Sequence, residues 1–391
     1  MEDHGEGWDS GCHVTTWRTL GIGLAMAVVL ATDSGAVAQT APTEPPKTFF
    51  QELTWFAYVE NSYTLNLRGK ATDGTNELRL YDVDRGYTFN MAEFSVKKEP
   101  SDRYPFGFGL VVTGGEDVQF NHAIGIFRDA DDAPSDTEKV DLQEAYLSYK
   151  VPVGAGLTLE AGKFVSPFGY EVIESPNNLN FSRGFLFTFA TPLSHVGLLA
   201  SYPVTEALTV TAGPVLGWDV ATGRNEAPSG IAQVVFTGVK DLSTSLGLIV
   251  GPEKTGDQRN LRWLLDLVAS YTGITGVTLA VEADYGREAD AAPAGGDAAW
   301  WGVAGYAAYD WTAALRTAVR LEYFRDADGV RTGFGSDLGV YAATATLQYK
   351  IWKGLVGRLE YRHDEADKKV FSGGTDKSQD TLSVSLYYSF F

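Results

Sequence analysis

Apolar and polar residues alternate along the last twelve residues of the chain, Asp380 to Phe391. One side of this stretch carries Leu382, Val384, Leu386, Tyr388 and Phe390, and the other carries Thr381, Ser383, Ser385, Tyr387 and Ser389. A period of two residues predicts a β-strand with one apolar and one polar face. Its length is enough for a tilted strand to cross a bilayer, which takes about 9–11 residues. A strand that ends a chain leaves an unpaired edge, and we expect the first strand of the chain to pair with it.

Similar stretches recur along the rest of the chain. The sixteen predicted strands lie at 51–67, 86–97, 104–113, 140–150, 157–165, 193–202, 207–219, 230–239, 243–251, 261–271, 276–286, 298–310, 314–326, 337–350, 354–366 and 380–391. An even number of strands is typical of bacterial single-chain membrane barrels. The pattern therefore predicts an all-β protein, a transmembrane antiparallel β-barrel of about 16 strands.

The connections between the predicted strands alternate between short and long. Turns such as 99–102 and 152–156 alternate with longer polar loops such as 114–139, 166–192 and 367–379. In an outer-membrane barrel the short turns lie at the periplasmic rim and the long loops lie at the extracellular rim. A soluble secreted β-sandwich would share the composition of this chain, but it has no reason to alternate its connections in this way.

Charged residues keep to one face of the predicted strands. In 261–271, Arg262 and Asp266 lie opposite an apolar face, and Glu282 and Asp284 do so in the next strand. The corresponding face of two later strands carries Arg316, Arg320, Glu322, Arg358, Glu360 and Arg362. Charges on one face, beside a second face suited to lipid, predict a barrel with a wet interior.

Residues 18–38 have the features of a secretory signal. Arg18 precedes an apolar stretch from Thr19 to Ala31, and Ala36-Val37-Ala38 is a cleavage site of the A-x-A kind. The apolar stretch is too short to span a membrane as a helix. We therefore expect a signal peptide with an N-terminal extension at 1–38, a flexible lead-in at 39–50 and the transmembrane barrel at 51–391. The acidic extension is unusual in a signal, and either a start codon further along or an ineffective extension would account for it.

Cysteine content and charge exclude several classes of protein. The single cysteine, Cys12, precedes the apolar stretch, so the chain has no cysteine after residue 38. This excludes disulfides and thiolate metal sites from the mature protein. Removal of residues 1–38 leaves a net charge of about −15, which argues against a nucleic-acid partner.

The sequence offers little for catalysis or for a metal site. After the signal, the histidines are His122, His195 and His363, each isolated in the sequence, and there is neither a G-x-S-x-G nor an H-E-x-x-H motif. Acidic residues between Asp129 and Asp141 could bind Ca²⁺, but they lack the EF-hand spacing, and a solvated loop is the simpler interpretation. We expect no enzymatic activity, no cofactor and no metal ligand.

The third long loop, 166–192, is the best candidate for control of a pore. A barrel of sixteen strands encloses an aqueous lumen, and a long loop that folds into it would narrow it. Charged side chains at the narrow part would then set selectivity. We hypothesise that Glu171 and Glu174 face cationic side chains across the pore. The candidates are Arg183 in the same loop and Arg316, Arg320, Arg358 and Arg362 on the strands. The alternative is an Asn-rich loop that points outward.

The same region carries a string of residues that is similar to a known family. It reads Gly162-Lys163-Phe164-Val165-Ser166-Pro167-Phe168-Gly169-Tyr170-Glu171, then Asn177-Asn178-x-Asn180-Phe181-Ser182-Arg183, then Pro192-x-Ser194-His195-x-Gly197. This string resembles the OmpL-like β-barrel porins of bacteria, and the resemblance covers about 49–391. It implies a porin of the Gram-negative outer membrane without catalytic residues. General porins use their third loop to narrow the pore, so the position of 166–192 is similar.

The resemblance also implies a mode of action and partners. We expect passive diffusion of small hydrophilic solutes or ions, with a weak cation preference from the acidic charge. The expected partners are outer-membrane lipid, lipopolysaccharide and the barrel-assembly machinery, and many sixteen-strand porins form homotrimers. The C-terminal aromatics Tyr388, Phe390 and Phe391 resemble an assembly signal. The alternative is a non-conducting outer-membrane barrel that acts in binding, adhesion or structure, and conductance would separate the two.

Overall fold

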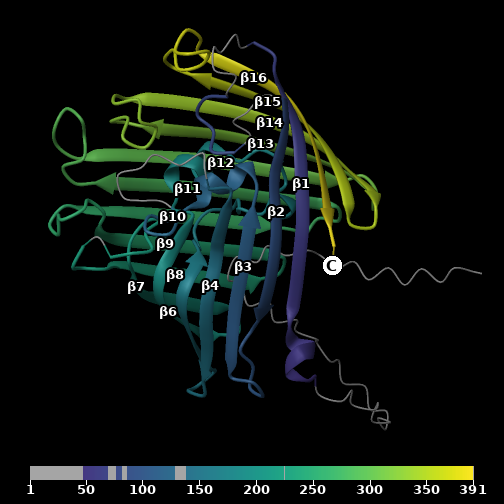
Figure 1. Cartoon of the computed structure of the whole chain (residues 1–391), viewed down its shortest axis with the longest axis vertical. Coiled ribbons are helices and arrows are strands. Elements are labelled where there is room, and N and C mark those ends of the chain that lie inside the picture. The colour runs from purple at the N-terminus through teal and green to yellow at the C-terminus, as the bar shows by residue number, and fades with distance from the viewer. Residues whose placement is uncertain (1–46, 69–75, 82–85, 128–137, 224, 391) are drawn as a thin grey trace, which may run out of the picture.

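The fold is a closed antiparallel β-barrel (Figure 1). The computed structural model describes residues 47–68, 76–81, 86–127, 138–223 and 225–390. Within these residues each strand pairs with its neighbours in sequence, and the last strand pairs with the first. The expected signal peptide at 1–38 lies outside the described residues. No helix among the described residues is long and apolar enough to cross a membrane.

Sixteen strands build the barrel within the described residues. They are β1 (Thr54–Asn66), β2 (Gly86–Lys98), β3 (Phe106–Gly114), β4 (Val140–Val151), β5 (Leu157–Val165), β6 (Ser194–Thr205), β7 (Leu208–Val215), β8 (Ser229–Val239), β9 (Leu242–Pro252), β10 (Leu261–Tyr271), β11 (Val277–Glu288), β12 (Ala298–Asp310), β13 (Leu315–Asp326), β14 (Leu338–Trp352), β15 (Leu355–Ala366) and β16 (Ser378–Ser389). Four short helical turns accompany them: η1 (Phe49–Glu52), η2 (Glu116–Asn121), η3 (Ser175–Asn177) and η4 (Leu186–Ala190). The predicted barrel and its strands are confirmed, with boundaries that differ by a few residues.

The final strand closes the sheet, as the alternation at the chain end predicts. Strands β1 and β16 pair from Tyr58↔Ser389 to Asn66↔Thr381, and the yellow β16 runs beside the purple β1 in Figure 1. Inside the barrel the hydroxyls of Thr64 and Ser383 are hydrogen-bonded at 2.9 Å. Closure gives backbone partners to both terminal strands, which leaves no open edge in the bilayer.

The two faces of the strands differ in the way the sequence predicts. On β16, Val384 and Leu386 point outward and are exposed, while Ser383 and Ser385 are buried on the inner side. Strand β10 repeats the arrangement, with exposed leucines on either side of the buried Asp266. The outer face therefore suits lipid, and the polar side chains of the strands point into the barrel.

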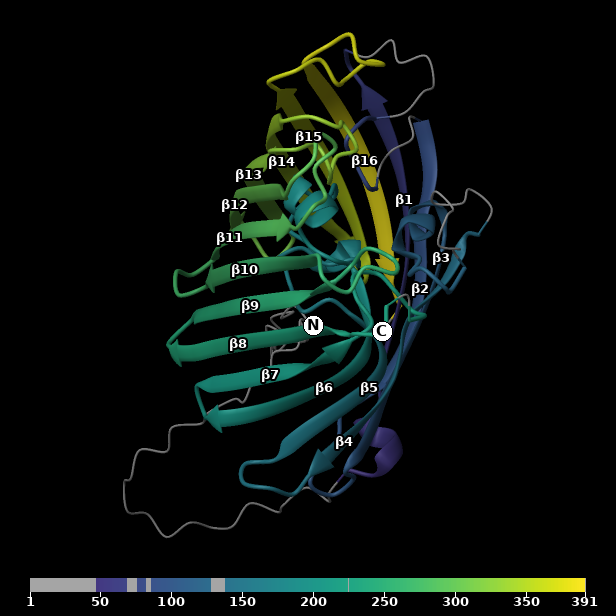
Figure 2. The ribbon, with the colours of Figure 1, turned by 90° about the vertical axis from the view of Figure 1, so that its left-hand side faces the viewer.

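The short turns and the long loops lie at opposite rims. Because β1 and β16 are antiparallel, the start of β1 and the end of β16 lie at the same rim, together with the short turns such as that between β14 and β15. Figure 2 shows the strands from β6 to β12 side by side. In the turn before β15, Gly354 has a φ of +79°, a conformation that glycine adopts without strain.

The C-terminal aromatics lie at the short-turn rim. Tyr388 pairs with Leu355 across β15 and β16. Phe390 is exposed, and its ring packs edge-on against Tyr388 with 4.9 Å between centroids. Phe391, the third residue of the expected assembly signal, lies outside the described residues.

Candidate functional site

The connection between β5 and β6, residues 166–193, lies inside the barrel and is called the inserted loop below. It is hydrogen-bonded to side chains on opposite parts of the wall. Its partners include Glu60 on β1, Gln143 on β4, Gln233 on β8, Asp266 on β10, Glu282 on β11, Trp300 on β12, Glu322 on β13, Thr346 on β14 and Glu360 on β15. Within the loop, η4 contacts β11 and β12, and Figure 2 shows short teal coils within the curve of the strands. The loop therefore spans the interior.

Carboxylates of the wall hold the amides of the inserted loop. Glu360 accepts hydrogen bonds from the backbone N–H groups of Phe181 (2.6 Å) and Ser182 (2.9 Å). Glu322 accepts one from the N–H of Phe185 (2.5 Å). Irregular backbone at membrane depth needs such partners, because neither lipid nor a strand neighbour satisfies its polar groups. The wall residues thus replace the hydrogen bonds that secondary structure would supply.

Arginines of the wall hold the carbonyls of the same loop. The contacts are Arg358 Nη2 to the carbonyl of Ser175 (3.0 Å), Arg320 Nη1 to that of Ser182 (2.6 Å) and Arg362 Nη1 to that of Arg183 (2.6 Å). A guanidinium group offers several donors in a fixed plane, so one arginine can bind the loop and a wall carboxylate together. Arg362 does this, with its Nε 2.6 Å from Asp364 Oδ1.

A buried ion pair joins the middle of the inserted loop to β13. Arg320 Nη1 lies 2.6 Å from Glu171 Oε1, and Arg320 Nε lies 3.1 Å from Glu322 Oε1. The other oxygen of Glu171 accepts the N–H of Gly184 at 2.6 Å. Burial raises the pKa of Glu171, and the nearby charge of Arg320 opposes that rise. One arginine thus serves two carboxylates in a site that excludes water.

The other candidates have different partners from those that the sequence suggests. Glu174 accepts a hydrogen bond from Gln143 Nε2 on β4 (2.6 Å). Arg183 donates to the carbonyl of Phe181 (2.7 Å), within the inserted loop, and its guanidinium lies over the ring of Tyr81. Arg316 pairs with Asp310 at the short-turn end of β12 and β13, with 2.6 Å between Nε and Oδ1. Of the candidate acids, the structure thus pairs Glu171 with an arginine of the wall.

Acidic side chains gather where the inserted loop faces β2 and β4. Glu174 interacts electrostatically with Glu93 on β2 and Glu144 on β4. Lys97 lies beside them, with its Nζ 2.6 Å from Glu144 Oε2. The Lys97 side chain is 22% exposed, whereas the Arg320 side chain is fully buried. This side of the interior is therefore acidic, and the Lys97 side chain beside the buried Glu93 and Glu144 is partly exposed.

Several wall residues that the alternation of the strands places on the inner face also belong to the site, although they are not among the candidates that the sequence suggests. Glu322 and Glu360 bind loop amides, and Asp266 and Glu282 accept the N–H groups of Gly169 and Tyr170, both at 3.1 Å. The alternation predicts that these side chains point inward, but it does not predict which amides of the loop they bind. The acidic stretch 129–136 lies outside the described residues, and the nearby Asp141 pairs with Lys163 at 3.1 Å.

An apolar cluster fills part of the interior that the sequence predicts to be wet. Phe185 and Leu186 of the inserted loop pack with Trp300, Phe324 and Leu338 of the wall, and all five are fully buried. Trp300 Nε1 also donates to the carbonyl of Ala190 at 3.2 Å. The loop brings its own apolar residues inside, so inward positions of β12 to β14 are apolar where they meet it.

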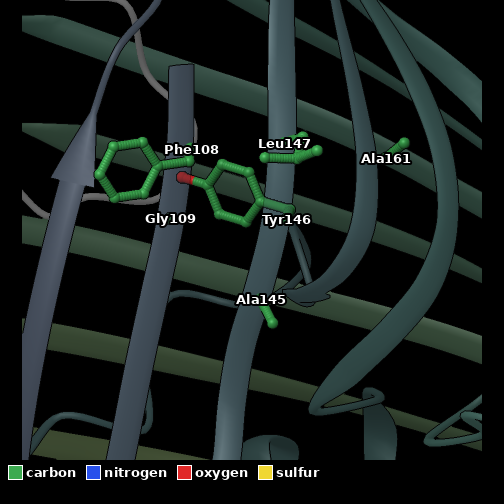
Figure 3. A pocket seen from close by; sticks show the side chains of 6 residues that line it. All are labelled: Phe108, Gly109, Ala145, Tyr146, Leu147 and Ala161. Carbon is green, nitrogen blue, oxygen red and sulfur yellow. The ribbon is translucent and has the colours of Figure 1, made fainter. Parts of the chain in front are cut away.

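A depression on the outer surface is distinct from this site. It lies over β3, β4 and β5 and is lined by Phe108, Gly109, Ala145, Tyr146, Leu147 and Ala161 (Figure 3). Ala145 and Ala161 are small, so they leave a hollow beside the larger Phe108 and Leu147. Because Leu147 is largely exposed on the apolar outer face, the hollow suits lipid and is unsuited to a hydrophilic solute.

Comparisons with known proteins agree with this architecture. The family model described as "Putative beta-barrel porin-2, OmpL-like" matches residues 52–390. A search of curated proteins finds no match. Among solved structures the chain is similar to OmpF of Salmonella typhi, solved with daunomycin (13% identity, 86% of this chain and 97% of that chain, TM-score 0.60). It is also similar to an anion-selective porin from Comamonas acidovorans (11% identity, 86% of this chain and 99% of that chain, TM-score 0.58). A third similar structure is OmpT of Vibrio cholerae in a trimer form (11% identity, 86% of this chain and 99% of that chain, TM-score 0.55).

The family match covers nearly the whole barrel. It includes the stretch around the inserted loop whose residues resemble this same family in the sequence. The solved structures, at such low identity, support the sixteen-strand fold. Membership also agrees with the expectation that the protein is a channel and not an enzyme. The chain belongs to the OmpL-like β-barrel porin family and is a porin of the Gram-negative outer membrane.

Proposed function

We propose that the protein lets small hydrophilic solutes and ions diffuse passively across the outer membrane, and that the inserted loop narrows their path. The observation that carries this proposal is the set of hydrogen bonds from the loop to opposite parts of the wall, including those to Glu60 on β1 and Gln233 on β8. A segment fixed in this way stays in place while solutes pass. The path runs on the side of β2 and β4, where Lys97 is partly exposed.

The charges along this path favour cations. Glu93, Glu144 and Glu174 outnumber Lys97 there, and Lys97 is already paired with Glu144. The wall arginines Arg320 and Arg358 do not offset this field, because they are buried against the inserted loop and its carbonyls. Rings of acidic side chains favour cations in other channels. The similar porin from Comamonas acidovorans is described as anion-selective, so the preference of this chain needs its own measurement.

We further propose that residues 1–38 direct export, that the terminal aromatics guide insertion by the assembly machinery, and that outer-membrane lipid and lipopolysaccharide surround the barrel. A homotrimer is the proposed assembly, supported by the trimer form of the similar OmpT. Light scattering of the detergent-solubilised protein tests it, and a monomer mass would refute it.

Solute uptake tests the proposed function. The purified protein is reconstituted into liposomes, and the rate of swelling is followed with neutral sugars of increasing size. The expected result is fast swelling with small sugars and a steep decline with larger ones, because the inserted loop limits the width of the path. Heat-modifiable gel mobility serves as the control that the barrel is folded in every sample.

A second candidate function is a closed barrel that serves as an anchor or a binding protein. The observation that favours it is the dense packing near β12 to β14, where Trp300 and Phe324 of the wall enclose Phe185. A closed barrel would insert into liposomes, show the same heat-modifiable mobility and yet give no swelling with any sugar. The swelling assay therefore separates the two candidates.

A further inference from the structure

Three carboxylates meet on the inner wall at β10 and β11. Asp266 lies directly opposite Asp284 in the pairing of these strands, and Glu282 lies two residues before Asp284 on the same face. One carboxylate oxygen from each residue can be chosen so that all three lie within 4.8 Å of one another. All three side chains are buried, with at most 4% exposure.

Several oxygens of this cluster are buried without a partner in the described part of the chain. Asp266 uses one oxygen to accept the N–H of Gly169, and Glu282 uses one to accept the N–H of Tyr170 and the hydroxyl of Tyr306. Among the described residues, no N–H or O–H group outside the cluster donates to Asp266 Oδ1, Glu282 Oε1, Asp284 Oδ1 or Asp284 Oδ2. The Asp284 carboxyl lies within hydrogen-bond reach of Asp266 and Glu282, so only a shared proton could join these groups directly. Among the described residues, no lysine, arginine or histidine forms an ion pair with any of the three acids.

Such an arrangement is costly without a positive charge. Like charges directly opposite each other on neighbouring strands destabilise a sheet, and burial of a carboxylate without a counter-charge is strongly unfavourable. The amides of Gly169 and Tyr170 offer partial charges and bind one oxygen each. The ring of Phe168, which occupies the space that Gly247 leaves beside Asp266, covers the cluster from the loop side. Either a bound cation or shared protons must therefore neutralise the three acids.

We propose that Asp266, Glu282 and Asp284 bind a divalent cation, with Ca²⁺ as the preferred ion. Calcium takes oxygen ligands at about 2.3–2.6 Å, so two oxygens on one ion lie up to about 5 Å apart. The three chosen oxygens all lie within 4.8 Å of one another, which is inside that limit. Magnesium demands nearly ideal octahedral geometry and usually keeps several waters, so it fits a site of three buried carboxylates less well. Asp284 offers both oxygens to the ion.

The site goes beyond the proposed diffusion function, because it does not depend on whether the barrel conducts. It lies where the inserted loop begins, since Asp266 and Glu282 hold the amides of Gly169 and Tyr170. A bound cation removes the repulsion among the three acids and keeps those carboxylates ionised as acceptors. The ion therefore fixes the start of the inserted loop against β10 and β11.

Terbium luminescence tests the site on the whole folded protein in detergent after removal of divalent ions with EDTA. Tb³⁺ takes oxygen ligands like those of Ca²⁺, and the nearby Tyr306 sensitises its emission. We expect saturable emission that Ca²⁺ displaces, and a loss of affinity of at least tenfold in Asp284→Asn. Asp297→Asn, which removes an exposed carboxylate from the β11–β12 loop, keeps the wild-type affinity. Equal Tb³⁺ affinity in Asp284→Asn and the wild type would overturn the proposal.

Thermal unfolding in EDTA and in Ca²⁺ gives an independent readout. In EDTA, Asp284→Asn should unfold at a higher temperature than the wild type, because it removes one of three like charges. Ca²⁺ should raise the unfolding temperature of the wild type and leave that of Asp284→Asn unchanged. A wild-type unfolding temperature that responds to pH but not to Ca²⁺ would mean that shared protons neutralise the cluster, and the cation proposal would be wrong.

Discussion

Arg320 on β13 and Glu171 in the inserted loop form a buried ion pair, with 2.6 Å between Nη1 and Oε1. The same guanidinium group contacts Glu322 on its own strand at 3.1 Å and the carbonyl of Ser182 at 2.6 Å. One side chain therefore neutralises a carboxylate of the wall and a carboxylate of the loop, and also holds the loop backbone. The sequence suggests several charged residues at the narrow part of the pore. Among them, we expect Arg320 to affect the position of the inserted loop most.

Replacing Arg320 tests this relationship. Arg320→Met keeps the length of the side chain but leaves Glu171 and Glu322 buried without their cation. The expected loss in free energy of unfolding is about 3–5 kcal/mol, the range for removal of one partner from a buried ion pair. Urea-induced unfolding in lipid vesicles, followed by tryptophan fluorescence, measures it. Arg320→Met combined with Glu171→Gln should recover part of the loss, and an unchanged stability of the single variant would contradict the assignment.

The stability of the barrel should depend on pH through Glu171. Burial raises its pKa above the ordinary value of 4.5, so the folded state favours the protonated form more than the unfolded state does. The stability that Glu171 contributes is therefore complete below its ordinary pKa and is lost as pH rises through the raised pKa. Urea midpoints from about pH 4 to about pH 8 should fall for the wild type relative to Glu171→Gln. Parallel curves for the two proteins would refute this assignment.

A glycine on β5 should be essential for close strand packing. Gly162 has a φ of +142°, and an added Cβ would lie 2.2 Å from the carbonyl oxygen of Ala145. Gly162→Ala should lower the free energy of unfolding by more than about 1 kcal/mol, because both the backbone angle and the space oppose the methyl group. Gly305→Ala is the matched control, since no atom lies within 4 Å of its added Cβ, and it should change stability by less than about 0.5 kcal/mol. Equal effects of the two substitutions would contradict the prediction.

An engineered cross-link tests where the inserted loop lies. Asn180 Nδ2 donates to Thr346 Oγ1 on β14 at 2.7 Å, so cysteines at these two positions should form a disulfide. The background is clean, because the chain has no cysteine after Cys12. We expect Asn180→Cys/Thr346→Cys to oxidise readily and to change its gel mobility on reduction. Free thiols after oxidation, in a barrel that is folded by heat-modifiable mobility, would mean that the loop lies elsewhere.

The strands were predictable from the sequence because two different solvents act on them. Lipid on one side and a polar interior on the other impose a period of two residues, which is visible in β10, β11 and β16 without any knowledge of contacts. The alternation of short turns and long loops then predicts that consecutive strands are neighbours and which strand ends lie at each rim of the barrel. Closure through β1 and β16 followed from the cost of an open edge.

The contacts of the inserted loop could not be predicted in the same way. Glu171 and Arg320 are 149 residues apart, and no repeat in the sequence relates them. The loop backbone has irregular conformation, so its partners depend on the path of the chain through the barrel. The apolar cluster of Phe185 and Trp300 follows from the same path, since Trp300 is buried by the loop. Likewise Asp266 and Asp284 become a cluster through the register of β10 and β11.

The central claim is that ions cross the barrel beside the acidic side of the inserted loop, and the reversal potential tests it most directly. Single channels of the wild type in a planar bilayer with a KCl gradient should open in discrete steps, with a reversal potential that indicates cation preference. Glu174→Gln should reduce that preference, because it removes a carboxylate facing Glu93 and Glu144. Glu226→Gln, the same change on the exposed β7–β8 loop, should not. An absence of conducting steps, or an identical reversal potential in all three proteins, would contradict the claim.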